Sequence, residues 1–146
     1  MNKKILIICA NYYPELSSIL KSNAEVFLKK EKIKSKCVYV PGIFEIPVII
    51  ARNIKKFDGF LALGCVIKGE TPHFDYISRS TFDALMKLSI DYKKPIGNGI
   101  ITALNKLQAI QRSGNDSSSK VQKKIGKGAE AAKAVLAVLK NGPKKS

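Results

Sequence analysis

The sequence Phe60-Leu61-Ala62-Leu63-Gly64-Cys65-Val66-Ile67 is an unbroken apolar run, and Lys68-Gly69-Glu70-Thr71-Pro72-His73 follows it directly. An apolar run of this length without polar alternation is typical of a strand that is buried on both faces of a parallel sheet. Thr71 and Pro72 then predict a helix start, as N-cap and first helical residue, and we expect this helix to run to about Tyr92. A strand that leads into a helix is the repeating unit of an α/β fold.

The same alternation of strand and helix extends to both sides of this stretch. We expect strands at residues 4–10, 36–40 and 96–102, and helices at 14–32, 47–57, 105–112 and 129–140. Because such alternation builds βαβ units, the sequence predicts an α/β protein, a three-layer α/β/α sandwich around a four-stranded parallel sheet. Residues 1–146 form one domain by length, with an extended polar loop at 113–126 and a frayed basic tail at 141–146.

The composition is that of an ordinary globular chain, with 45% hydrophobic residues. No apolar stretch approaches the roughly 20 residues that span a bilayer. The apolar run at 4–10 leads into Asn11-Tyr12-Tyr13-Pro14 without a small-residue cleavage site, so it does not match a signal peptide. We therefore expect a cytoplasmic protein that has no membrane contact.

The chain is strongly basic, with a formal net charge of +15, and eight of its lysines lie beyond residue 119. This balance fits either a solvated lysine-rich surface or the binding of anions, including nucleic acid and phosphorylated small molecules. No aromatic side chain interleaves the basic C-terminal segment, which weakens a role in single-strand binding. We expect no nucleic-acid partner.

The three cysteines, Cys9, Cys37 and Cys65, each lie in or beside an apolar run. An odd number of cysteines without a close pair predicts buried, reduced thiols rather than disulfides. No cysteine or histidine partner lies within ligand spacing, so we expect no metal site.

Ligands of parallel sheets bind outside the carboxyl ends of the strands. In this chain the rule selects residues 11–14, 41–47, 68–73 and 97–102. No Gly-x-Gly-x-x-Gly fingerprint follows the first predicted strand, and no Walker motif is present, so the sequence does not support dinucleotide or nucleoside triphosphate binding.

His73 is the only histidine of the chain, and it falls in the first turn of a predicted helix. Histidine is the side chain that ordinarily takes up and releases protons near neutral pH. The backbone N–H groups of Gly69, Glu70 and Thr71 precede the same helix and could bind an anion. From spacing alone, His73 is either a proton-transfer group beside an anion site or an incidental surface histidine.

Several further side chains each admit a functional and a structural interpretation. Glu45, between Pro41 and Pro47, either accepts hydrogen bonds from a polar ligand or stabilises the N-terminus of the next helix. Tyr12 and Tyr13, directly after the first predicted strand, either offer a ring that stacks on a ligand or pack over the sheet edge. Arg112 is one of three arginines among many lysines and suits a bidentate oxyanion contact, although one arginine does not make a site.

Taken in order, these segments resemble the lumazine synthases, enzymes of riboflavin biosynthesis. The resemblance implies a flavodoxin-like fold and a transferase that needs no cofactor or metal. It condenses 5-amino-6-(D-ribitylamino)uracil with 3,4-dihydroxy-2-butanone 4-phosphate to give 6,7-dimethyl-8-ribityllumazine, phosphate and water. The matching stretches are colinear over nearly the whole chain: Val40-Pro41-Gly42-Ile43-Phe44-Glu45-Ile46-Pro47, Leu63 to Tyr76, Pro95-Ile96-Gly97-Asn98-Gly99-Ile100-Ile101-Thr102, Gln108-Ala109 with Arg112, and Gly126 to Ala132.

The resemblance also implies a role for each candidate residue. His73 matches the histidine that transfers protons in the family. The implied substrate contacts are Tyr12 on the pyrimidine, Gly42, Ile43, Phe44 and Glu45 on the ribityl chain, Cys65, Val66 and Ile67 along the pyrimidine, Gly69, Glu70, Thr71, Arg112 and Lys127 on the phosphate, and Asn98 from the adjacent subunit.

The chain departs from the family pattern in a few places. Asn11 stands where many members have arginine, and Leu104 stands where an acidic residue is common. The segment between Arg112 and Lys127 is longer than in the compact form of the family, in which a short turn accompanies closed capsids. We therefore expect a homopentamer, or at most a pair of pentamers, with active sites between adjacent subunits.

Two alternatives come from other classes of protein. One is a catalytically idle lumazine- or flavin-binding protein on the same fold, and the other is a basic nucleic-acid binder. The first predicts tight ligand binding without turnover, and the second predicts an affinity that falls steeply with salt.

Overall fold

The computed structural model describes residues 2–70, 72–114 and 126–141. Its four strands form one sheet, and all three neighbouring pairs are parallel. The order across the sheet is β2-β1-β3-β4, so β2 lies on one side of β1, and β3 and β4 lie on the other side. The strands are β1 (Lys4–Ala10), β2 (Lys34–Val40), β3 (Gly59–Ile67) and β4 (Ile96–Ala103).

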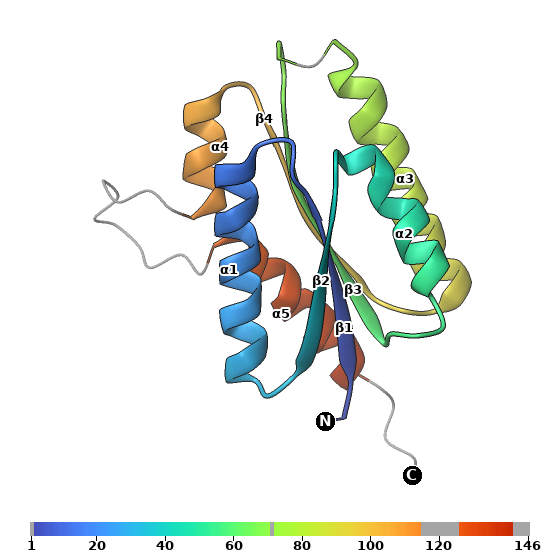
Figure 1. Ribbon diagram of the computed structural model, residues 1–146. Coiled ribbons are helices and arrows are strands. Elements are labelled where there is room, and N and C mark those ends of the chain that lie inside the picture. Colours follow the sequence, from blue (N-terminus) through green and yellow to red (C-terminus); the bar gives the residue numbers. More distant parts are fainter. Residues whose placement is uncertain (1, 71, 115–125, 142–146) are drawn as a thin grey trace.

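Helices cover both faces of the sheet, which confirms the predicted three-layer α/β/α sandwich (Figure 1). One face carries α1 (Pro14–Lys30), α4 (Lys106–Ser113) and α5 (Lys127–Lys140), which contact one another. The other face carries a short 3-10 helix, η1 (Ile43–Glu45), followed by α2 (Ile46–Asn53) and α3 (Phe74–Tyr92). None of the helices that the structure describes combines the length and apolar composition of a bilayer-spanning segment.

The helix predicted at residues 47–57 begins within one residue of the observed start, but its predicted C-terminal end was wrong. The chain already turns at η1, because the Glu45 side chain accepts a hydrogen bond from the Gly42 N–H (2.9 Å) and closes the turn. Helix α2 ends at Asn53, and the carbonyls beyond it are bound by Lys94, whose Nζ donates to the Phe57 oxygen (2.9 Å). A side chain from a distant part of the sequence therefore sets this helix end.

The predicted start of α3 at Thr71 and Pro72 was also wrong. The helix begins at Phe74, and His73 is its N-cap residue, without a side-chain capping bond. Phe74 is the first side chain of this segment to pack against the core, so the helix starts where burial begins. Thr71 lies outside the described residues, and His73 moves from the first turn to the position before it.

Strand β3 is the centre of the core, since all nine of its residues are buried. One apolar layer joins the sheet to α1 and α5, and the other joins it to α2 and α3. A fully buried aliphatic side chain of this kind contributes about 1.5–3 kcal/mol. Gly64 allows a close approach here: a Cβ on it would lie 2.9 Å from both the Ala10 Cβ and the Ile43 Cγ2. Its bare backbone therefore lets η1 sit directly on the sheet.

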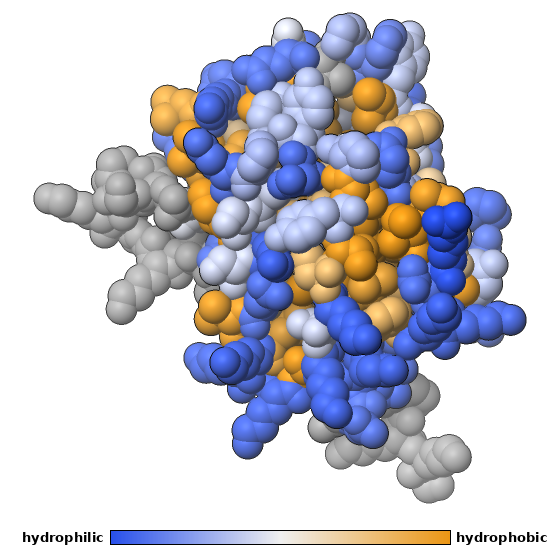
Figure 2. Space-filling model, viewed as in Figure 1, coloured by the Kyte–Doolittle hydropathy of each residue, from blue (hydrophilic) through white to orange (hydrophobic). Residues whose placement is uncertain are grey.

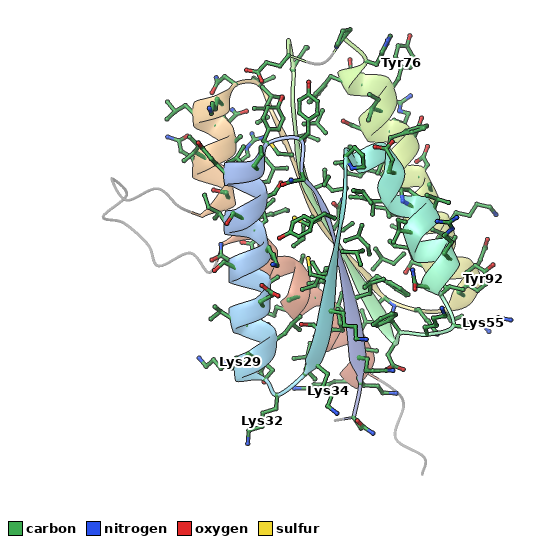
Figure 3. All side chains as sticks on the ribbon, in the orientation of Figure 1. Lys29, Lys32, Lys34, Lys55, Tyr76 and Tyr92 are labelled. Atoms are coloured by element: carbon green, nitrogen blue, oxygen red, sulfur yellow. The ribbon has the colours of Figure 1, made fainter. Side chains whose placement is uncertain are left out.

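Exposed lysines gather at the end of the molecule where the strands begin. Figure 3 shows Lys29, Lys32, Lys34 and Lys55 at this end, and Tyr76 at the opposite end. Lys34 is the first residue of β2, and Lys29 lies in the last turn of α1. Much of the positive charge of the fold therefore lies away from the carboxyl ends of the strands.

Candidate active site

The carboxyl ends of three neighbouring strands bring most of the predicted site residues to one edge of the sheet. Tyr12 follows β1, residues 42–45 follow β2, and residues 65–67 end β3. Residues 69–70 and His73 continue from β3 toward α3, at the top of Figure 1. We call these residues the carboxyl-end cluster, and they include the only histidine of the chain.

The segment after β2 presents one aromatic ring and one carboxylate. Phe44 is 62% exposed, whereas Ile43 beside it is buried in the core. The Oε1 atom of Glu45 is bound to the Gly42 N–H, so the structural role that the sequence left open for Glu45 is present. The same bond fixes the carboxylate at the mouth of the cluster, and its contact with a ligand stays a prediction.

The end of β3 forms an apolar wall, because Cys65, Val66 and Ile67 are all buried. Burial raises the pKa of the Cys65 thiol to about 11, and the nearby charge of Glu70 acts in the same direction. A thiol with this pKa stays protonated at neutral pH and is a poor nucleophile. Cys65 therefore lines the site rather than attacking a substrate.

Tyr13, considered together with Tyr12 as a possible stacking ring, makes a hydrogen bond that the sequence did not predict. Its hydroxyl donates a hydrogen bond to the Oε2 of Glu70 (2.9 Å), and its ring meets Tyr12 edge-on at 4.9 Å between centroids. Burial and the contact with Glu70 raise the pKa of Tyr13, so the hydroxyl keeps its proton and acts as a donor. Its place beside Tyr12, directly after β1, was the only signal in the sequence.

The turn after β3 carries the residues predicted to bind an anion. Gly69 has a positive φ of 89°, a backbone conformation that suits glycine. The Glu70 N–H donates to the Ile67 carbonyl (3.3 Å), so this amide is engaged within the turn. His73 is exposed at the start of α3, where helix amides and the helix dipole favour an anion nearby.

A second group of predicted residues lies around α4 and α5. Arg112 in the last turn of α4 and Lys127 at the first position of α5 line one pocket of about 360 Å³. The Nη1 of Arg112 donates to the carbonyl of Thr102 at the end of β4. Glu130 also lines this pocket and was not predicted from the sequence. Two cations at a helix N-terminus suit a phosphate.

Asn98 does not join either group within one chain. It is exposed on the edge strand β4, opposite Ala62 and three residues before the partner of Cys65. At about 3.3 Å for each residue, Asn98 lies roughly 10 Å short of the carboxyl-end cluster. Its Oδ1 accepts from the Ile100 N–H (3.0 Å).

No group of three or more His, Cys, Asp or Glu side chains is placed to hold a metal ion in residues 2–70, 72–114 and 126–141. Two acidic side chains of the carboxyl-end cluster, Glu45 and Glu70, accept hydrogen bonds from protein donors.

Comparison with known proteins gives consistent matches over nearly the whole chain. A family model described as 6,7-dimethyl-8-ribityllumazine synthase matches residues 2–141. The chain is 39% identical to a 6,7-dimethyl-8-ribityllumazine synthase of Bartonella tribocorum, over 96% of this chain and 93% of the relative. It is 38% identical to the protein of the same name from Novosphingobium aromaticivorans, over 93% of this chain and 94% of the relative. A third, from Beijerinckia indica subsp. indica, is 36% identical over 94% of this chain and 74% of the relative.

Proposed function

The chain belongs to the 6,7-dimethyl-8-ribityllumazine synthase family and is an enzyme of riboflavin biosynthesis, and from this premise we propose how its residues carry out the reaction. Its substrates are 5-amino-6-(D-ribitylamino)uracil and 3,4-dihydroxy-2-butanone 4-phosphate, and its products are 6,7-dimethyl-8-ribityllumazine, phosphate and water. The observation that carries the assignment of residues is the carboxyl-end cluster, which places the only histidine beside the segments that match the family pattern.

His73 is the proton-transfer residue in this proposal. Attack of the pyrimidine amine on the ketone, loss of water, elimination of phosphate and ring closure all require proton transfers. His73 is exposed at the start of α3, where it can reach a substrate bound over the end of β3. Holding the two substrates together supplies much of the rate, so one acid–base group suffices.

Arg112 and Lys127 bind the phosphate of the butanone substrate. They line one pocket, and the first turn of α5 adds its helix dipole. Charge-assisted hydrogen bonds of this type contribute about 1.5–3 kcal/mol each. Residues 42–45 and Tyr12 then hold the ribityl chain and the pyrimidine, as the family pattern implies.

Two subunits build each site. Residues 42–45 follow β2 and Asn98 lies on β4, and these strands are at opposite edges of the sheet. Three strand spacings of about 4.8 Å separate them by roughly 14 Å, too far for one small substrate to bridge within a single chain. A neighbouring copy that presents its β4 edge to the β2 end of the first would complete the site.

The surface supports such an assembly. Figure 2 shows hydrophobic surface over the region of β2 and α2. Phe44 is 62% exposed, Val48 55% and Val38 39%, and exposed apolar side chains of this kind mark interaction surfaces. We propose a homopentamer in the cytoplasm, with small molecules as its only other partners.

The direct test of the activity is to mix the purified chain with both substrates and follow the absorbance and fluorescence of the lumazine. Product above the uncatalysed background supports the proposal. Tight binding of lumazine without any product would favour the idle binding protein instead.

A complementation experiment tests the shared site. His73→Ala removes a group from the carboxyl-end cluster, and Arg112→Ala removes one from the half at the β4 edge, where Arg112 contacts the Thr102 carbonyl. Each variant alone should lose most of its kcat/KM. Mixed assemblies of the two variants contain some sites with both groups intact, and about a quarter of the activity should return if subunits assort at random. No recovery in verified mixed assemblies would contradict a site between subunits.

A further inference from the structure

The contact between Tyr13 and Glu70 joins the start of α1 to the turn that precedes His73. We propose that Tyr13 is a positioning residue, whose hydroxyl holds the Glu70 carboxylate away from the phosphate of the butanone substrate. This inference rests on the proposed function and adds to it a residue that restrains a negative charge inside the site.

The geometry places the carboxylate on the side of the turn that faces α1. The Oε2 of Glu70 accepts from the Tyr13 hydroxyl at 2.9 Å. The Glu70 N–H donates to the Ile67 carbonyl at 3.3 Å, so the backbone of this residue is held at the end of β3. The position of the carboxylate is therefore fixed by a contact outside the turn at residues 69–73.

Tyr13 is suited to hold this position permanently. Burial and Glu70 raise the pKa of its hydroxyl, which therefore donates a proton over the whole physiological pH range. The ring of Tyr13 packs against the core and against Tyr12, so the hydroxyl has little freedom to move. Glu70, in contrast, is an exposed side chain on a turn that begins with a glycine of positive φ.

Loss of the hydroxyl would release the carboxylate. Glu70 lies in the segment predicted to bind the phosphate, and two like charges a few ångströms apart repel each other even in water. A released carboxylate about 4 Å from a singly charged phosphate weakens binding by about five-fold in bulk water, and by more near a protein surface or for a doubly charged phosphate. The pyrimidine substrate, which carries no phosphate, is unaffected by this repulsion.

The experiment is a double-mutant cycle of Tyr13→Phe and Glu70→Gln, with steady-state kinetics on both substrates and inorganic phosphate binding by calorimetry. Tyr13→Phe should raise the KM of the butanone phosphate and the Kd of phosphate about five-fold, and change the KM of the pyrimidine by less than about two-fold. In the Glu70→Gln background, Tyr13→Phe should change the KM of the butanone phosphate and the Kd of phosphate by less than about two-fold, because no charge is left to release. The five-fold effect should also shrink as salt is raised.

Tyr92→Phe is the matched control, because Tyr92 is an exposed tyrosine at the end of α3 opposite His73 and should leave these constants unchanged. Any of three results would overturn the proposal. These are an equal rise in both KM values, an unchanged Kd for phosphate, and the same effect of Tyr13→Phe with and without the Glu70 charge. Turnover by the wild-type chain distinguishes a failure of this inference from a failure of the proposed function. If it makes lumazine and Tyr13→Phe behaves like it, only the role of Tyr13 fails, whereas absence of wild-type turnover rejects the function itself.

Discussion

Gly114 and Gly126 lie backbone against backbone, since a Cβ on Gly114 would sit 2.5 Å from the Gly126 Cα. Both have positive φ, at 91° and 80°, and they flank the long segment at residues 115–125. The two ends of this segment therefore lie side by side. This contact explains how Arg112 and Lys127 share a pocket despite the residues inserted between them.

Shortening the inserted segment should therefore cost little stability. Replacing residues 116–124 by a short Gly-Ser link keeps the ends at the same distance, and loop length changes the free energy of unfolding by only about 0.6 kcal/mol per doubling. Chemical denaturation should show a change below about 1 kcal/mol. Gly126→Val is the contrasting variant, because its side chain would collide with Asn23 and its backbone conformation adds about 1–3 kcal/mol of strain. A large loss of stability in the shortened chain would show that the segment supports the fold.

The size of the assembly is a second prediction. A pentamer of this 16.0 kDa chain has a mass of about 80 kDa, and a pair of pentamers twice that. Light scattering or sedimentation should give one of these masses. A particle in the megadalton range would contradict the expectation drawn from the long segment between Arg112 and Lys127.

Arg112→Ala should weaken binding of the phosphate substrate selectively. Loss of a charge-assisted contact worth about 1.5–3 kcal/mol corresponds to a rise in KM of at least about ten-fold. The KM of the pyrimidine should change by less than about two-fold. Lys29→Ala is the control, because Lys29 is exposed in the last turn of α1, at the end of the molecule where the strands begin (Figure 3). A selective loss of pyrimidine affinity would remove Arg112 from the phosphate pocket.

Gly64→Ala should disturb the segment after β2 by displacing Ile43, although Gly64 itself is not a predicted ligand contact. The added Cβ would lie 2.9 Å from both Ala10 and Ile43, so η1 has to move away from the sheet. We expect a destabilisation of about 1–3 kcal/mol, with a raised KM for the pyrimidine substrate. Unchanged kinetics in a folded variant would show that the close packing of η1 does not position the ribityl contacts.

The buried thiols should make stability fall at high pH. Burial raises the pKa of Cys9 from 9.0 to about 11, so between these values the folded state keeps a proton that the unfolded state loses. The stabilisation is present below about pH 9 and is lost as pH rises toward 11. Because lysines and tyrosines titrate in the same range, the measurement is the difference in pH slope between the wild type and Cys9→Ala. Identical slopes would show that this thiol does not contribute.

The layers of the fold followed from the sequence because its strands carry strong local signals. Strand β3 is apolar at almost every position, and a strand buried on both faces has few other structures open to it. The starts and ends of helices were less well predicted. The start of α3 depends on where Phe74 meets the core, and the end of α2 depends on Lys94, which lies 37 residues from Phe57.

The candidate site was also predicted only in part. The sequence placed His73 and residues 65–67 near one another because the carboxyl ends of parallel strands share an edge. It gave no indication of the bond between Tyr13 and Glu70, which are 57 residues apart, because spacing says nothing about where a side chain from another strand points. It also did not show that the ends of the inserted segment meet, which is what brings Lys127 to Arg112.

This chain should make lumazine from the two substrates with release of phosphate. The most direct measurement follows lumazine absorbance and inorganic phosphate in the same reaction, with either substrate omitted as the control. Lumazine and phosphate should form in equal molar amounts. Their formation should exceed the uncatalysed background only when both substrates and the folded protein are present. A lumazine rate equal to the background, or phosphate release without lumazine, would contradict this prediction.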